Sequence, residues 1–195
     1  MRGEQNMLKL PEIRTERLLL RTYVPEDMET VFLMATDPGI AQHLPGSEKI
    51  TRESVIAGLP KRRERWAKQG FGQLGIVLRE TGKLIGYCGL KYLGETGEVE
   101  IYYGIFPQYQ RKGYAVESAT AVLRFGFERA GLERIVGVTQ EDNVDSQRVL
   151  EKIGLKRGEK ADFYDMEVEY FSLDRSDYQP SRAEYNLTFT ETDDQ

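Results

Sequence analysis

The chain has 195 residues, a length that suits one ordinary folded domain. Its composition, 39% hydrophobic and 30% charged, excludes a disordered or collagen-like protein. Its 27 basic and 32 acidic residues give a net charge of −5, which disfavours a generally basic nucleic-acid binder. With one cysteine, Cys88, and one histidine, His43, an intramolecular disulfide and a cysteine-based zinc cluster are excluded, and a histidine-rich metal site is hard to build.

The two ends of the sequence differ from its middle. Residues 1–12 contain no apolar segment typical of a signal peptide, and we expect them to form a loose lead-in. Residues 13–173 carry the periodic patterns of one folded domain. Residues 174–195 hold six acidic residues and two arginines, which predicts a flexible acidic tail, with 185–189 as a short piece able to dock on the fold. Because no apolar run approaches the ~18 residues that a membrane span needs, we expect a cytoplasmic protein that does not cross a membrane.

The first part of the folded segment predicts one strand and two helices. Residues 17–22 have the pattern of a strand. Pro25 then suits the first turn of a helix, which ends at residues 37–39, Asp-Pro-Gly. A second helix is predicted over residues 51–70, where Pro60 is a point of interruption.

The second part predicts six strands and two helices, and glycines follow both helices as C-caps. The predicted strands are 71–79, 84–93, 99–106, 135–139, 155–157 and 166–173, and the predicted helices are 114–130 and 143–153. The order β-α-α-β-β-β-α-β-α-β-β, with antiparallel hairpins between helices, predicts an α/β or α+β domain with one central mixed sheet.

The turn between the strand 99–106 and the helix 114–130 has the features of an anion site. Gly113 lacks a Cβ, so backbone can come close to a ligand there, and Arg111 and Lys112 add positive charge. The first turn of a helix also offers unpaired N–H groups and the positive end of the helix dipole. These features predict phosphate binding; the alternative is an ordinary helix start at which Gly113 only permits the turn. The segment is neither a Walker loop nor a dinucleotide fingerprint.

Residues 110–115, Gln-Arg-Lys-Gly-Tyr-Ala, match the (Arg/Gln)-x-x-Gly-x-(Gly/Ala) signature of the GNAT acetyltransferase superfamily. Other segments match in the same order and spacing: 14–21, 100–101, 143–146 and 149–155. The chain therefore resembles this superfamily over about residues 13–173, and in particular the branch related to the ribosomal-protein N-terminal acetyltransferases.

This resemblance implies a central mixed, mostly antiparallel sheet of about seven strands with about four flanking helices. It implies direct acetyl transfer from acetyl-CoA to a primary amine, which can be a protein N-terminus, a small amine or polyamine, or an amine-bearing antibiotic. It implies no metal, and it leaves a homodimer open. The cofactor contacts that it implies are Ile105, Phe106, Gln110, Arg111, Lys112, Gly113, Tyr114, Ala115, Asn143 and Ser146.

Glu100 is the first candidate for the base that takes the proton of the amine, because it interrupts an apolar strand and the family often places a glutamate there. Glu98, on the same face of the strand, is the alternative. Asn143 suits a helix N-cap that also lies near the cofactor, and Ser146, one turn later, is a candidate proton donor to the leaving thiolate. Many family members carry a tyrosine where this chain has Leu150, so Ser146, water, a tyrosine from elsewhere or unassisted departure must serve instead.

Two other classes of function remain open from sequence. One is a catalytically inactive CoA-binding sensor or interaction module, which would bind the cofactor without releasing free thiol. The other is a nucleic-acid-binding domain that uses the basic pairs at 62–63 and 111–112, which would bind with steep salt dependence. The net negative charge argues against the second.

Overall fold

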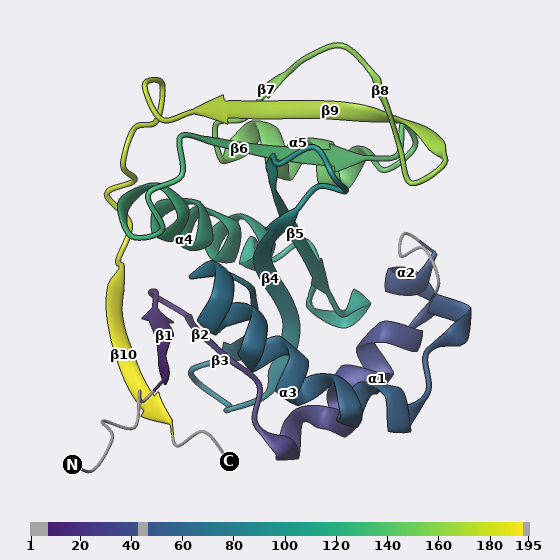
Figure 1. Cartoon of the computed structure of the whole chain (residues 1–195), viewed down its shortest axis with the longest axis vertical. Coiled ribbons are helices and arrows are strands. Elements are labelled where there is room, and N and C mark those ends of the chain that lie inside the picture. The colour runs from purple at the N-terminus through teal and green to yellow at the C-terminus, as the bar shows by residue number, and fades with distance from the viewer. Residues whose placement is uncertain (1–7, 43–46, 193–195) are drawn as a thin grey trace, which may run out of the picture.

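One mixed sheet of ten strands organises the computed structural model of the chain, which describes residues 8–42 and 47–192 (Figure 1). The strands are β1 (Leu8–Arg14), β2 (Leu18–Arg21), β3 (Gln73–Leu78), β4 (Leu84–Tyr92), β5 (Val99–Ile105), β6 (Arg134–Thr139), β7 (Lys156–Arg157), β8 (Ala161–Phe163), β9 (Met166–Asp174) and β10 (Asn186–Thr192). The helices are α1 (Met28–Thr36), α2 (Pro38–Ala41), α3 (Arg52–Gln69), α4 (Tyr114–Glu128) and α5 (Val144–Lys152), with short 3-10 turns at Pro25–Asp27, Ser47–Lys49 and Pro107–Tyr109.

The strand order is β10-β1-β2-β3-β4-β5-β6-β9-β7, and β8 pairs with β9 outside this path. Neighbouring strands are antiparallel except β5 and β6, which run parallel. β5 and β6 share a single register pair, Glu100 with Val136, so the two strands separate beyond that point. The sheet is thus split between β5 and β6.

Local sequence signals explain where the helices begin and end. Thr51 and Ser54 form a reciprocal capping box at the start of α3, and Gly70 ends that helix in the left-handed conformation at φ 73°. Pro60 lies inside α3, which is continuous through it, so the expected interruption does not occur. Asn143 caps α5 by accepting a hydrogen bond from the Ser146 N–H at 3.1 Å, as its position in the sequence predicts.

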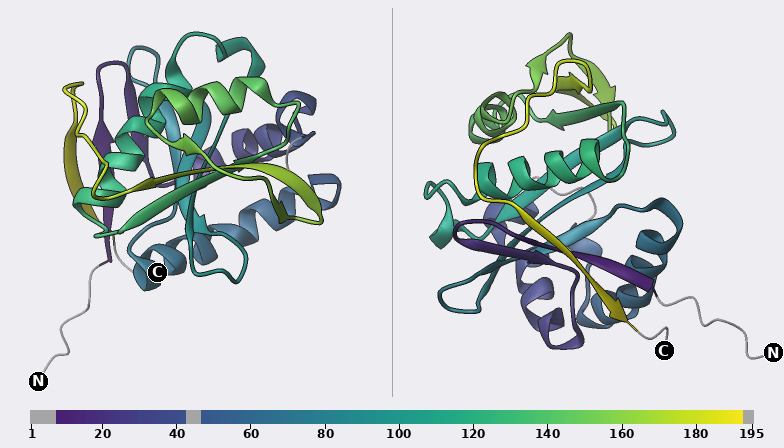
Figure 2. Two further views of the ribbon diagram at one scale, coloured as in Figure 1. Left: turned by 90° about the horizontal axis from the view of Figure 1, so that it is seen from above. Right: turned by 90° about the vertical axis from the view of Figure 1, so that its left-hand side faces the viewer.

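The helices cover opposite faces of the sheet, as the two views of Figure 2 make clear. Helix α4 packs on the face of β4 that carries Cys88 and Leu90, and both side chains are fully buried in the larger core. Helix α1 and the first part of α3 pack on the other face, where Val55 joins Tyr23 and Tyr87 in a second apolar cluster. Near the end of α3, Trp66 reaches the larger core and contacts Phe125 of α4. Two cores therefore lie on either side of the strands that border the split.

The predicted α/β class and mostly antiparallel sheet are confirmed, with ten strands and five α-helices in the described residues in place of about seven and about four. The added elements include both ends of the chain. Strand β1 begins inside the segment expected to be a loose lead-in, and β10 lies in the segment expected to be a flexible tail. The two pair over seven residues, from Leu8 with Thr192 to Arg14 with Asn186, so backbone hydrogen bonds order the polar segment of β10 against β1, whose Leu10 and Ile13 are buried in the core.

Candidate functional site

A cleft of about 1090 Å³ lies where β5 separates from β6. Its walls come from the α2 region, from β4 and β5, from the loop that leads into α4, and from the start of α5. Gly104 of β5 has no side chain, and the ring of Tyr87 lies where its Cβ would project, with ring carbons 2.7 Å from that position. Because Tyr87 lies on the α1–α3 face and Tyr103 on the α4 face, the cleft reaches from one face of the sheet to the other.

Backbone geometry shapes the loop between β5 and α4 for close contact with a ligand. Arg111 and Gly113 both have left-handed conformations, at φ 59° and φ 83°. Gly113 is the residue directly before α4, and the first intrahelical hydrogen bond there runs from the Glu117 N–H to the Gly113 carbonyl at 3.0 Å. The N–H groups of the first turn therefore have no partner within the helix and lie at the positive end of its dipole.

Most of the residues predicted to contact a cofactor line this cleft. They are Ile105, Gln110, Arg111, Gly113, Tyr114, Ala115, Asn143 and Ser146. Two do not: Phe106 packs against the second apolar cluster, and the Lys112 ammonium lies 5.8 Å from the centre of the Tyr109 ring. The predicted anion loop and the two predicted residues around α5 are thus brought to one cavity by elements that are distant in sequence.

Arg17, which the sequence analysis did not select as a site residue, connects the loop before α4 to the turn between β1 and β2. Its Nη1 donates to the Lys112 carbonyl at 2.9 Å, its Nε donates to Glu117 Oε2 at 2.7 Å, and its guanidinium lies 4.6 Å from the centre of the Tyr114 ring. Thr15 adds a hydrogen bond to the same carboxylate at 2.6 Å. The sequence signal was the segment 14–21, which matched the family without assigning a role to any one residue.

Tyr103 is the second residue that the sequence analysis missed. Its hydroxyl donates to the Ser146 carbonyl at 3.0 Å and lies 3.1 Å from Ser146 Oγ. Both side chains line the cleft, so two hydroxyl groups meet there. Leu150 is buried in the core at 1% exposure and packs toward Gly137, so it belongs to the packing of α5 and not to the cleft.

Glu100 lies at the pair where β5 and β6 last meet, and only 4% of its surface is exposed. Tyr164 donates a hydrogen bond to Glu100 Oε2 at 2.8 Å, and the Lys91 ammonium lies 3.3 Å from the same oxygen. Burial raises the pKa of Glu100 above its ordinary value, and this outweighs Lys91 and Tyr164, which act in the opposite direction. A carboxyl group with a raised pKa is suited to accept a proton near neutral pH.

Glu98, the alternative base, is in a different environment. It precedes β5, its carboxylate accepts a hydrogen bond from Tyr170 at 2.7 Å, and Arg134 lies 3.5 Å away. Its side chain is 31% exposed, against 6% for that of Glu100. Glu100 is therefore the more desolvated of the two.

Cys88 is buried beneath α4, and burial raises the pKa of its thiol to about 12. A thiol in this state supplies almost no thiolate at neutral pH, so a covalent acetyl-cysteine step is not supported. His43, the single histidine, lies outside the described residues.

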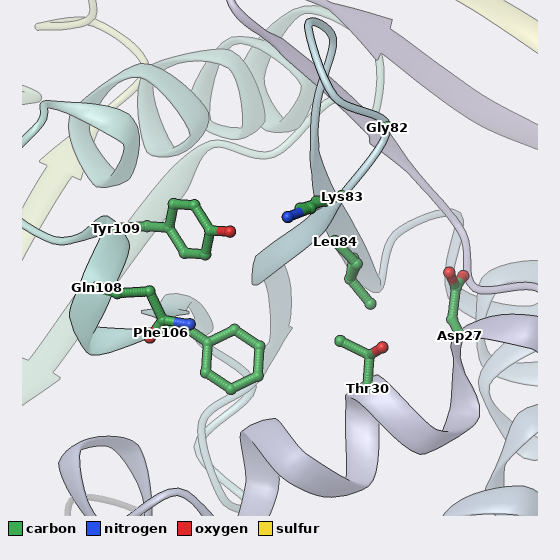
Figure 3. Close-up of a pocket in the computed structure, with 8 residues that line it drawn as sticks. All are labelled: Asp27, Thr30, Gly82, Lys83, Leu84, Phe106, Gln108 and Tyr109. Atoms are coloured by element: carbon green, nitrogen blue, oxygen red, sulfur yellow. The ribbon is translucent and has the colours of Figure 1, made fainter.

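A smaller cavity of about 350 Å³ lies on the far side of the 3-10 turn that follows β5 (Figure 3). In the close-up, Phe106, Gln108 and Tyr109 lie on one side of the cavity and Asp27 on the other, with Lys83 between them. The Asp27 carboxylate forms an ion pair with Arg21 at 2.6 Å, so its role is to stabilise the 3-10 turn that precedes α1. Within residues 8–42 and 47–192, no group of three or more His, Cys, Asp or Glu side chains is placed to hold a metal ion, and no helix is long and apolar enough to cross a membrane.

Comparison with known proteins decides the family. Residues 17–156 match the sequence model of the acetyltransferase (GNAT) domain. The chain belongs to the GNAT acetyltransferase family. It is 35% identical over 146 residues to the uncharacterized N-acetyltransferase YnaD of Bacillus subtilis (strain 168), a match that covers 74% of this chain and 82% of that protein.

Solved acetyltransferase structures share the fold of this chain. The acetyltransferase from Agrobacterium tumefaciens str. C58 superposes with a TM-score of 0.74 at 27% identity, covering 88% of this chain and 99% of that one. The ribosomal-protein-S5-alanine acetyltransferase from Vibrio fischeri superposes with a TM-score of 0.73 at 19% identity, covering 87% and 99%, and shares the fold. The predicted resemblance to the GNAT superfamily, with ribosomal-protein acetyltransferases among its structural neighbours, is thus confirmed, and the protein is an acetyltransferase.

Proposed function

We propose that this GNAT protein transfers the acetyl group of acetyl-CoA directly to a primary amine. The observation that carries the proposal is the cleft at the β5–β6 split, because it joins an anion-binding helix start to unpaired strand edge and reaches both faces of the sheet. Its volume of about 1090 Å³ is at the upper end of the range for ligand sites and leaves room for a ligand larger than a small metabolite.

The residues present fit a pyrophosphate and a pantetheine arm. The N–H groups at the start of α4 would bind the pyrophosphate, and the hydrogen bond from Arg17 to the Lys112 carbonyl would hold that loop in place. Beyond Glu100, no strand of the described residues pairs with the edge of β5 that faces β6, so backbone groups there can pair with the amides of the arm. The Ile105 carbonyl at the end of this edge accepts a hydrogen bond from Gln110 Nε2 at 3.0 Å. Acetyl-CoA would supply the activated acetyl group.

Glu100 takes the proton of the acceptor in this proposal. The amine must be neutral to attack, and its nitrogen forms the C–N bond as the C–S bond breaks, while its proton passes to the Glu100 carboxylate directly or through one water. In this proposal the acetyl group forms no covalent intermediate with the protein, which agrees with the buried, protonated state of Cys88.

Ser146 and Tyr103 would stabilise the leaving thiolate in place of the tyrosine that Leu150 replaces. Their hydroxyls are 3.1 Å apart in the cleft, so one can donate toward the sulfur while the other holds it in position. Burial raises the pKa of Tyr103, which keeps its proton available as a hydrogen-bond donor over the neutral range.

Thermal unfolding with acetyl-CoA tests the binding half of this proposal, with desulfo-CoA and ATP as controls. A ligand that binds only the folded state at a hundredfold over its Kd adds about 2.7 kcal/mol to the free energy of unfolding. We expect an increase in Tm with both CoA compounds and none with ATP. No increase with folded protein would remove the CoA site, and Gly113 would then be only a turn residue.

Release of free CoA thiol tests the catalytic half. A panel of spermidine, an aminoglycoside antibiotic and a hexapeptide with a free α-amino group covers the three classes of primary amine that the family implies. We expect release that depends on the amine for at least one of them. Binding of acetyl-CoA without release with any amine would favour the inactive CoA-binding module.

A further inference from the structure

The turn between β8 and β9 has an unusual residue at its tip. Phe163 pairs with Met166, so the hairpin loop consists of Tyr164 and Asp165, and both have left-handed backbones at φ 56° and φ 60°. This geometry belongs to two-residue turns that favour asparagine and glycine, and a bulky aromatic residue there is an outlier. Strained residues of this kind persist where the surrounding structure holds them, and they gather at functional sites.

The side chain of Tyr164 connects this turn to Glu100. Its hydroxyl donates to Glu100 Oε2 at 2.8 Å and accepts a hydrogen bond from Lys91 Nζ at 3.0 Å. The three side chains come from β5, β4 and the β8–β9 turn, and Tyr164 is 39% exposed while Glu100 is 4% exposed. Tyr164 therefore lies between the buried carboxylate and the solvent.

The two oxygens of the Glu100 carboxylate have different partners. Tyr164 and Lys91 both engage Oε2. Within the part of the chain that the structure describes, no hydrogen bond or ion pair is made to Oε1. One oxygen is thus held in place and the other is left for a proton.

The charged and titratable groups around Glu100 are few and belong to identified elements. β4 contributes Lys91 and Tyr87, the β8–β9 turn contributes Tyr164, and Tyr102 lies on the same face of β5 with its ring centre 5.1 Å from Lys91 Nζ. Arg134 of β6 and Tyr170 of β9 face Glu98 and not Glu100. The environment of the Glu100 carboxylate is therefore set mainly by Lys91 and Tyr164.

We propose that Tyr164 is a positioning residue for the acetyl transfer: together with Lys91 it fixes Oε2 of Glu100, so that Oε1 accepts the amine proton, and it thereby sets the pH range of the reaction. This inference rests on the proposed function. Removal of the Tyr164 hydroxyl takes a donor away from the charged form of Glu100, which raises the pKa of this carboxyl. A base with a higher pKa is protonated, and inactive, up to a higher pH.

The test compares Tyr164→Phe with Tyr170→Phe. Each variant deletes one tyrosine hydroxyl that donates a hydrogen bond to a glutamate in or next to β5. The Tyr164 hydroxyl lies 2.8 Å from Glu100, and the Tyr170 hydroxyl lies 2.7 Å from Glu98. Carboxyl-carbon NMR titration, with Glu100→Gln to identify the resonance, measures the pKa of Glu100 without any acceptor. The pH profile of kcat/KM, from thiol release with the amine panel, measures its consequence.

We expect Tyr164→Phe to raise the Glu100 pKa and the acidic limb of the profile together by about one pH unit, with about a tenfold loss of kcat/KM below that limb and little change above it. Tyr170→Phe should move neither. Lys91→Met should shift the limb in the same direction as Tyr164→Phe, which provides a second route if one variant folds poorly.

Superimposable profiles for Tyr164→Phe and the wild type would overturn this inference, and so would a Glu100 pKa that does not change. A limb that moves in Tyr170→Phe instead would make Glu98 the base and Tyr164 irrelevant. The Tm of each variant and of the wild type is also measured with and without acetyl-CoA. If the proposed function is wrong, the wild type itself shows no increase in Tm. If only the role of Tyr164 is wrong, the increase in Tm remains in every variant while the pH profiles stay superimposable.

Discussion

Arg17 connects the β1–β2 turn to the loop before α4 through one side chain. It bonds to the Lys112 carbonyl and to Glu117 and stacks on Tyr114. Because the hydrogen bond to a backbone carbonyl fixes the loop itself, loss of the guanidinium should increase the freedom that ligand binding must remove.

We therefore expect Arg17→Ala to weaken acetyl-CoA binding about tenfold, a change of about 1.4 kcal/mol in binding free energy, measured by calorimetric titration. Arg14→Ala is the matched control, because Arg14 lies on the neighbouring strand and bonds only to Glu12 among the described residues. Equal Kd values for the two variants would show that the loop needs no support from Arg17.

Single residues also mark the limit of what the sequence could predict about the site. The loop residues and Ser146 were accessible to sequence analysis because spacing and helix-start chemistry identify them locally. Tyr103 and Tyr164 were not, because a tyrosine in a strand or turn has an ordinary explanation until its hydroxyl partner is known. Their partners, Ser146 and Glu100, are 43 and 64 residues away in the chain.

Helix α4 depends on the backbone of Gly113 for the direction in which it begins. Gly113 has φ 83°, and a Cβ there would lie 3.3 Å from Arg17 Nη2. A side chain at a left-handed position is strained, so Gly113→Ala should lower the free energy of unfolding by about 1 kcal/mol and should also disturb the N–H groups that face the cleft.

Gly97→Ala gives the comparison for that variant. Gly97 has φ 79° in the turn between β4 and β5, with open space around its Cβ position, so its backbone strain is similar, and it lies at the opposite end of β5 from the loop. Denaturant unfolding should show similar losses for both variants, whereas the Kd of acetyl-CoA should rise only for Gly113→Ala. A rise in both would attribute the effect to general destabilisation.

Elements with their own hydrophobic periodicity were predicted, and elements that depend on a distant partner were not. The strands from β2 to β6 and the helices α1, α3, α4 and α5 have local patterns that sequence analysis recognises. Strands β1 and β10 pair with each other across 172 to 184 residues of the chain, from Arg14 with Asn186 to Leu8 with Thr192. A polar segment such as 186–192 carries little local signal of this pairing.

The whole sheet places the cleft and the paired ends of the chain far apart. Strand β10 is the edge of the sheet, and four strands, β1 to β4, lie between it and β5, which borders the cleft. Its removal would leave β1 as an unpaired edge and would uncover the region around Leu10 and Ile13, which are now buried. The cost should therefore fall on stability and solubility, with the acetyl-CoA site intact.

A variant that ends after Tyr185 tests this separation. We expect its Tm to fall by several degrees, since a loss of 1 kcal/mol lowers Tm by about 2–4 °C in a domain of this size, and we expect faster aggregation through the exposed edge. The increase in Tm on addition of acetyl-CoA should stay the same as in the full chain. Glu191→Ala, which removes only the exposed ion pair with Lys9 at 3.5 Å, should behave like the wild type in both measurements. If acetyl-CoA no longer increased the Tm of the shortened chain, the outer strands would be needed to hold the split between β5 and β6 in its binding geometry. The removal of β10 would then change the cleft across the four strands that separate β10 from β5.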